Sequence, residues 1–357
     1  MQLLNRINKG LLLCTSVLIL VVLQGCENAP KLDDSQLNAG KVSIQAGLDI
    51  SLFKDGAFIL PPKIVECETT AGTKTTCYEL KTSGAPAMRE PGPFCPRNTT
   101  DGADVGGAWF DKSGSGDLID ITGEFIVNLS RYYDDPNWML YDPKTNKIRY
   151  TDTKASCLGA AKPDVEEQYK QNCIECLMSY LDDDFSRTYL IPTTPIKAEE
   201  TQRVRTVGIA LDGAELSGSA PVNAILGSYT IAAFDDCGGH INVHQGYHYH
   251  STTGCTDTVT TDDGHAPLVG YAPDGYGIYA MEDAQGKEES LDECRGSTDE
   301  VRGYHYHAAS PSENMIIGCI RGETVKSADE HAGPPPGADG RPPRDGRPPK
   351  DGKPPRD

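Results

Sequence analysis

The chain has 357 residues, of which 38% are hydrophobic and 24% charged, so it is neither a disordered polymer nor a protein with many membrane spans. Its 37 Gly and 25 Pro predict short elements joined by many turns, which argues against a helical bundle. The formal net charge of −19 repels polyanions, so we expect no nucleic-acid partner. The same charge attracts cations, including metal ions. Seven of the eight His lie between His240 and His307, and this cluster directs the search for function.

The N-terminus has the features of an export signal. Two basic residues precede an apolar run over residues 11–23, which is too short for a stable membrane span. The run ends in Leu-Gln-Gly-Cys, which resembles a bacterial lipobox. We therefore expect residues 1–25 to be removed as a signal peptide and Cys26 to carry lipid that holds the protein at a membrane. A simple cleaved signal or a retained anchor is the alternative, and either would still export the chain.

The residues after Cys26 fit a lipid-anchored protein of the cell envelope. Residues 26–40 predict a tether, and Glu27 favours sorting to the outer membrane, on its periplasmic or outer side. Loss of the signal would take the net charge from −19 to −21.

The cysteines predict a set of structural disulfides. After export ten Cys remain besides Cys26, and an oxidising compartment favours up to five bridges among them. Cys67 and Cys77 flank a turn centred on Gly72, so we expect a bridge across a hairpin. Cys173 and Cys176 fit two separate bridges, to partners such as Cys95 and Cys157, better than redox or zinc chemistry. The other candidates are Cys237, Cys255, Cys294 and Cys319.

Residues 41–200 predict an α+β region with many loops and disulfides. We expect one helix, over residues 163–181, because apolar side chains recur every three or four residues after Pro163. Cys173 and Cys176 would lie on that helix. The predicted strands cover residues 41–50, 57–60, 63–82 and 125–129.

Two further segments show distinctive patterns. Residues Asp111 to Thr122 carry oxygen ligands at alternate positions around a Gly, as in an EF-hand loop, but Thr122 stands where a bidentate Glu is needed, so we expect a turn rather than calcium. Residues 333–357 repeat a Pro-rich hexad and predict a disordered tail of polyproline type. This tail is a solvated spacer or a contact for an anionic envelope polymer.

The C-terminal half contains an internal duplication. Residues 234–250 and 291–307 align without a gap, share eight of 17 residues and both end in Gly-Tyr-His-Tyr-His. Upstream, residues 207–213 match residues 269–275. Two copies, about 204–255 and 266–319, are each too small for a core of their own, so we expect them to pack as one β-rich domain with approximate two-fold symmetry.

These motifs resemble the YHYH-domain proteins, an exported bacterial family named after the tetrapeptide. The resemblance covers about residues 204–322 and implies the domain without implying a particular reaction. Its second copy often carries His where this chain has Ser297, so a symmetric extra ligand is not expected. The resemblance rests on Asp212-Gly213, Cys237-Gly238-Gly239-His240, both Tyr-His-Tyr-His segments, Ala266 to Ala272, Leu291 to Cys294 and Ile317-Gly318-Cys319.

The duplicated His-x-His pairs suggest a metal site. In a strand, His248 and His250 lie on one face and the two Tyr on the other, and the second copy supplies His305 and His307. If the two strands meet near the pseudo-dyad, four imidazoles converge on copper or zinc, with nickel less common. Further ligand candidates are His240, His244 and His265, and the carboxylates that we expect to orient the rings are Asp235, Asp236, Asp292 and Glu293.

Several functions fit this pattern. The first is a metal-binding envelope lipoprotein for storage, sensing or stabilisation. The second is a metal-dependent hydrolase or oxidoreductase, with Asp236 or Glu293 as general base, although no familiar hydrolase motif is present. The third is a structural or adhesive surface protein in which each His is hydrogen-bonded within a cross-strand ladder and no metal binds.

Overall fold

The computed structural model describes residues 47–325, except 88, 113–115, 163, 255, 257, 262 and 282–289. The predicted signal peptide, lipidated Cys26, tether and Pro-rich tail lie outside the described residues. No helix among those described combines the length and apolar character needed to cross a membrane. The described part is rich in strands with a few short helices, which confirms the prediction of a mainly β or α+β fold.

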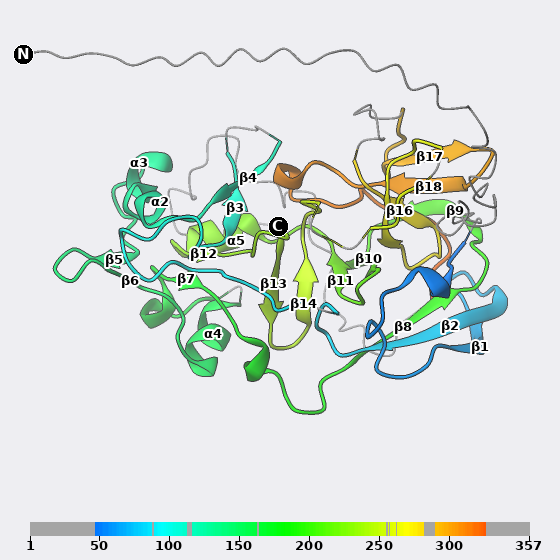
Figure 1. The fold of residues 1–357 in the computed structure, drawn as a ribbon, viewed down its shortest axis with the longest axis horizontal. Coiled ribbons are helices and arrows are strands. Elements are labelled where there is room, and N and C mark those ends of the chain that lie inside the picture. The colour runs from blue at the N-terminus through cyan, green and yellow to red at the C-terminus, as the bar shows by residue number, and fades with distance from the viewer. Residues whose placement is uncertain are drawn as a thin grey trace, which may run out of the picture. The chain divides into compact units, whose positions relative to one another are not determined.

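The largest element is an eight-stranded sheet built from the two sequence copies. Its strands follow the order β13-β14-β11-β10-β15-β16-β18-β17. Figure 1 shows both ends of this sheet, the β13–β14 hairpin near the centre of the view and the β17–β18 hairpin at the upper right. The first copy supplies β10 (Thr206–Ala210), β11 (Glu215–Ser217), β13 (Gly239–Asn242) and β14 (Gly246–Tyr249). The second supplies β15 (Leu268–Tyr271), β16 (Gly277–Tyr279), β17 (Gly296–Asp299) and β18 (Gly303–His307).

The predicted two-fold relation runs through the centre of this sheet. β10 and β15 pair antiparallel, with Ile209 opposite Tyr271, and these two residues are equivalent in the aligned copies. Outside this pair, β11 and β14 are parallel neighbours, as are β16 and β18. An antiparallel hairpin closes each end, β13 with β14 and β17 with β18.

The other sheets are small. A three-stranded sheet contains β1 (Lys63–Glu68), β2 (Lys74–Thr82) and β8 (Arg187–Pro192). Pairs of strands form the rest: β3 (Ala108–Phe110) with β4 (Leu118–Asp120), β5 (Tyr141–Asp142) with β6 (Lys147–Ile148), β7 (Cys173–Ile174) with β12 (Ile231–Ala232), and β9 (Lys197–Gln202) with β19 (Ile320–Gly322).

The described helices are all short. The α-helices are α2 (Gly123–Val127), α3 (Leu129–Tyr132), α4 (Lys154–Ala160) and α5 (Val222–Gly227). The 3₁₀ turns are η1 (Ile50–Leu52), η2 (Glu167–Tyr169), η3 (Met178–Tyr180) and η4 (Pro311–Glu313).

Several predicted elements are wrong. Residues 164–181 hold η2, β7 and η3 instead of one helix, so Cys173 lies on a short strand. Residues 125–129 belong to α2 and α3 instead of a strand, because the side chain of Thr122 accepts the Phe125 N–H and caps the helix start. Residues 47–50 and 57–60 form no strand. The hairpin within residues 63–82 is confirmed as β1 and β2.

The disulfides follow the predicted pattern. Cys67–Cys77 joins the β1–β2 hairpin, and Cys294–Cys319 joins two of the candidates. Cys173 and Cys176 form separate bridges, to Cys95 and Cys157 respectively. Cys237 is also disulfide-bonded, while Cys255 lies outside the described residues.

Residues from both sides of position 200 share one hydrophobic core. Trp109 on β3 stacks on Phe234, with ring centroids 5.5 Å apart, and the Ala108 N–H donates to the Phe234 carbonyl. Arg89 donates to the hydroxyl of Tyr247 (2.6 Å) and to the carboxylate of Asp235 (3.0 Å). The N-terminal region thus supports the strand that carries the first Tyr-His-Tyr-His segment.

Candidate metal centres

Each Tyr-His-Tyr-His segment presents its two His on one face of a strand, as the sequence predicted. On β14 and just beyond it, His248 and His250 have ring centroids 4.9 Å apart. On β18, the centroids of His305 and His307 are 5.1 Å apart. All four side chains are buried, with exposed fractions between 1% and 6%.

The four imidazoles do not converge as we expected. Four strands, β11, β10, β15 and β16, lie between β14 and β18, so the two pairs belong to separate sites. Each pair instead gains a third His. The ligand atoms within each resulting group lie within 4.8 Å of one another.

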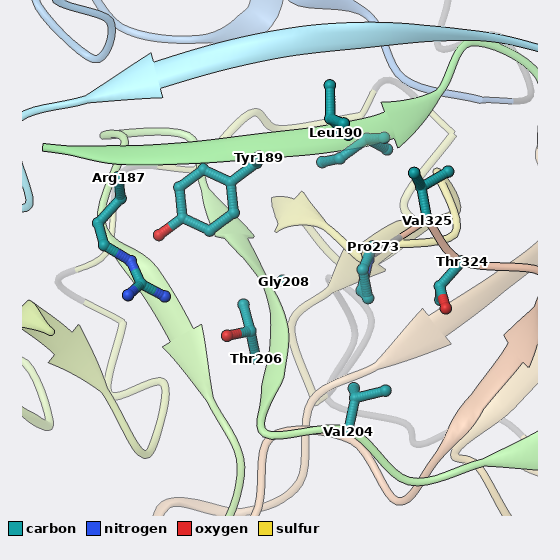
Figure 2. Close-up of a pocket in the computed structure, with 10 residues that line it drawn as sticks. Arg187, Tyr189, Leu190, Val204, Thr206, Gly208, Pro273, Thr324 and Val325 are labelled. Atoms are coloured by element: carbon teal, nitrogen blue, oxygen red, sulfur yellow. The ribbon is translucent and has the colours of Figure 1, made fainter. Parts of the chain in front are cut away.

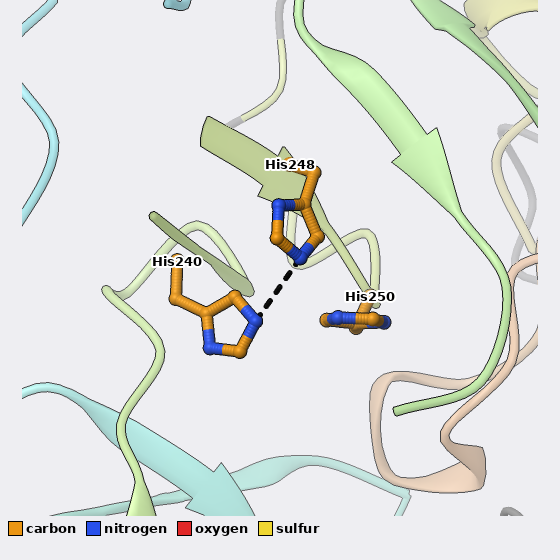
Figure 3. Close-up of side chains that lie close together, drawn as sticks. All are labelled: His240, His248 and His250. Carbon is orange, nitrogen blue, oxygen red and sulfur yellow. Dashed lines mark hydrogen bonds between the residues drawn. The ribbon is translucent and has the colours of Figure 1, made fainter. Parts of the chain in front are cut away.

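The first triad contains His240, His248 and His250 (Figure 3). His240 comes from β13, where it pairs directly opposite His248 across the hairpin. The Nε2 atoms of these two rings are 3.1 Å apart, and the centroid of His250 lies 5.1 Å from that of His240. The rings of His240 and His250 also pack against Phe234.

The second triad contains His265, His305 and His307. Its third member cannot come from the matching hairpin position, because Ser297 lies opposite His305. His265 reaches the site from the segment before β15, and its Nε2 lies 3.0 Å from Nε2 of His305. The sequence identified all six residues as candidates, but it did not show which would group together.

Backbone carbonyls hold the rings in one tautomer. Nδ1 of His248 and of His305 lie 3.1 and 2.9 Å from the carbonyls of Gly246 and Gly303 respectively. A carbonyl only accepts, so each Nδ1 carries a proton and the neutral ring presents a lone pair at Nε2. Both glycines have a positive φ, 82° and 64°, which other residues rarely adopt, so the glycine before each motif is part of the site.

The remaining rings follow the same rule. Nδ1 of His250 donates to the Gly218 carbonyl at 2.7 Å, and Nδ1 of His307 donates to the Ala280 carbonyl at 3.0 Å. Nδ1 of His265 donates to the Ala266 carbonyl at 3.0 Å. In the second triad, the carbonyls thus occupy all three Nδ1 atoms, and the Nε2 atoms of His265 and His305 face each other.

Burial favours the neutral form of four of the rings. It lowers the pKa of His248 to about 4, of His250 to about 3 and of His305 to about 4. The pKa of His240 is also well below its usual value, because of burial and because His248 and His250 are close. Neutral imidazole is the form that binds a metal ion.

The predicted carboxylate partners lie elsewhere. Asp235 accepts the hydroxyl of Tyr247 at 2.8 Å, and Asp292 accepts that of Tyr304 at 3.0 Å, both on the tyrosine face of the strands. Asp236 and Glu293 are exposed. Carbonyl oxygens, and not these carboxylates, accept from the five Nδ1 atoms described above. His244 is exposed in the β13–β14 turn, outside both triads.

The first triad lines a cavity of about 330 Å³. A second, smaller cavity of about 40 Å³ lies where β8 passes β10 (Figure 2). Of its lining residues, Arg187 (3.1 Å) and Thr206 (2.9 Å) both donate to the buried carboxylate of Glu215. These contacts pair the buried charges of Arg187 and Glu215. We therefore interpret the smaller cavity as a gap in the packing between the sheets.

Comparison with known proteins supports the resemblance to YHYH-domain proteins that the motif indicated. No curated protein and no solved structure matches the chain. The family model described as YHYH protein matches residues 188–297, a segment that contains the first triad and ends at Ser297, before the second Tyr-His-Tyr-His. This chain therefore carries a YHYH domain.

Proposed function

We propose that the YHYH domain binds two transition-metal ions, one in each His triad, with copper or zinc as the metal. The observation that carries this proposal is the set of three carbonyl-bound Nδ1 atoms in the second triad. Two of the resulting Nε2 lone pairs, on His265 and His305, face each other at 3.0 Å, which is repulsive unless a cation lies between them.

One nitrogen–nitrogen distance in each triad suits a shared ion, and the third ring has its ligand atom within 4.8 Å of the other two. Copper or zinc binds imidazole nitrogen at about 2.0–2.1 Å, so two nitrogens on one ion lie about 2.9–3.4 Å apart. The Nε2 pairs at 3.1 and 3.0 Å fall in this range. The described cysteines are all disulfide-bonded, which leaves an all-nitrogen donor set and favours copper, zinc or, less often, nickel.

We also propose that the domain works at the cell envelope, anchored through lipid on Cys26. The disulfide-bonded cysteines support an oxidising compartment. The net charge of −21 expected after loss of the signal peptide would favour capture of cations there.

Metal analysis of the full chain, purified without a His tag, tests the main proposal. We expect two equivalents of copper or zinc per chain, one in His248→Ala, one in His305→Ala, and none in the double variant. His244→Ala is the matched control, because this His lies in the same hairpin outside the triads. A folded wild-type chain that binds no copper or zinc at micromolar concentration would overturn the proposal and favour a hydrogen-bonded His ladder.

A further inference from the structure

The two triads have the same ligands but different surroundings. In the second triad, the ring of Tyr279 packs against His265 and His305, with centroid distances of 4.7 and 5.2 Å. All three of its His are at most 7% exposed. The first triad instead forms part of the wall of the 330 Å³ cavity, and His240 is partly exposed.

One residue difference contributes to this contrast. Leu216 pairs with Tyr249 in the first copy, and Ile278 pairs with Tyr306 in the second, so the next residues, Ser217 and Tyr279, occupy equivalent positions. Ser217 lines the cavity. Its small side chain leaves open the space that a tyrosine ring fills beside the second triad.

The rest of the cavity suits an organic molecule. Its wall combines aliphatic groups from α4, α5 and the strands with several polar and charged side chains, among them Lys162 and Glu175. Its volume is at the lower end of the range of about 300–1,000 Å³ found for small-molecule sites. The aliphatic members include Ala160, Val165, Ile174, Ala224, Ile225 and Ala232, and the polar ones include Arg205 and Gln245.

We infer that the metal ion at the first triad keeps an open coordination position toward this cavity and binds a small organic molecule with a nitrogen or oxygen donor and an apolar body. The inference rests on the proposed metal binding. Three His with one open position is the arrangement of zinc sites that bind a substrate or water, whereas closed sites are structural. In the second triad, the ring of Tyr279 occupies the corresponding space beside His265 and His305.

The test uses the full chain loaded with Co²⁺, whose visible spectrum reports its ligands, and 4-phenylimidazole as probe. We expect one equivalent of probe per chain, bound at least ten-fold more tightly than imidazole because the phenyl group enters the apolar cavity. Ser217→Tyr, which copies the second triad, should weaken binding at least ten-fold while the chain still binds two Co²⁺. His244→Ala should bind the probe like the wild type.

Ala224→Trp tests the same cavity from an exposed position on α5, in case Ser217→Tyr fails to fold. It should also weaken 4-phenylimidazole without loss of metal. Two equivalents of probe, no preference over imidazole, or unchanged binding in the folded cavity variants would overturn the inference and leave the metal proposal standing. Failure of the wild-type chain to bind metal would overturn both.

Discussion

Alternate residues of each Tyr-His-Tyr-His segment use different hydrogen-bond acceptors. The His rings donate to backbone carbonyls, while Tyr249 and Tyr306 donate to the buried carboxylates of Asp212 and Asp274, both at 2.6 Å. The strand period of two separates these sets on opposite faces. The tetrapeptide therefore places a polar network that fixes the strand on one face and the proposed metal ligands on the other.

Asp274 supplies a prediction about pH. It is fully buried, and burial raises its pKa from 3.8 to about 6 despite hydrogen bonds from Tyr306 and the Gly322 N–H. The folded state therefore binds this proton more tightly than the unfolded state, so Asp274 lowers stability progressively as the pH rises from 3.8 to about 6. At pH 7 the ionised Asp274 therefore destabilises the folded state by about 3 kcal/mol, because each pKa unit corresponds to about 1.36 kcal/mol.

Chemical unfolding of the wild type and Asp274→Asn at pH 4 and pH 7 measures this effect. The stability advantage of the wild type over the variant should be about 2–3 kcal/mol larger at pH 4 than at pH 7. The variant shares all other titrating groups, so their contributions cancel. Equal differences at the two pH values would contradict the raised pKa.

At the scale of single residues, the sequence predicted all six ligand candidates. It could not predict their grouping, because the third ligand of the second triad, His265, has no counterpart in the first copy. The carboxylate partners were wrong for another reason. Backbone carbonyls leave no trace in a sequence pattern, apart from the positive-φ glycines that precede each motif.

Among the elements, the two hairpins show how one site geometry can be built in two ways. In the first copy, the third ligand lies on β13 opposite His248, and in the second, Ser297 on β17 takes that position opposite His305. The backbone register is the same in both. The ligand position on β17 should therefore be able to serve a metal if it carried an imidazole.

A transplanted ligand tests this equivalence. His265→Ala should lose one metal equivalent per chain, and the double variant His265→Ala/Ser297→His should regain it. Metal analysis by mass spectrometry measures both, with Ser297→Ala in the His265→Ala background as control. If the double variant binds no more metal than His265→Ala, the two hairpins are not interchangeable as ligand supports.

Element predictions failed where tertiary contacts overrode local periodicity. The apolar spacing after Pro163 fits a helix. However, Cys173 is bonded to Cys95 and Cys176 to Cys157, and these bridges hold the segment in a different conformation. Cys173 lies on β7, where it pairs with Ile231 of β12. A disulfide partner 78 residues away is invisible to a local pattern. The long hairpin β1–β2 was predictable because its turn and its cross-strand cysteines are local.

For the whole molecule, the sequence predicted the duplicated domain with its two-fold relation. It did not predict the strand order, because β11 and β16 are placed between the central pair and the motif strands by parallel pairings with no sequence signal of their own. Every described cysteine is disulfide-bonded, and the proposed export would place these bridges in an oxidising compartment.

The proposed envelope anchor leads to a direct prediction. In a bacterial host with lipoprotein processing, the wild-type chain should fractionate with membranes and carry lipid on its N-terminal peptide, which mass spectrometry detects. Cys26→Ala should lose both properties. Cys14→Ala is the matched control, because this residue is removed with the predicted signal. Membrane association that survives Cys26→Ala, with no lipid on the wild type, would contradict lipidation.

The strand order of the large sheet has one more consequence. β14 and β18 are five steps apart, and at about 4.8 Å per step the two triads are separated by about 24 Å. Dinuclear centres hold their ions about 3.5–4 Å apart, so no molecule of the size of the cavity bridges both ions. Each ion would act as a mononuclear centre. Duplication would thus provide two independent copies of one proposed centre, and a difference such as that between Ser217 and Tyr279 changes one without affecting the other.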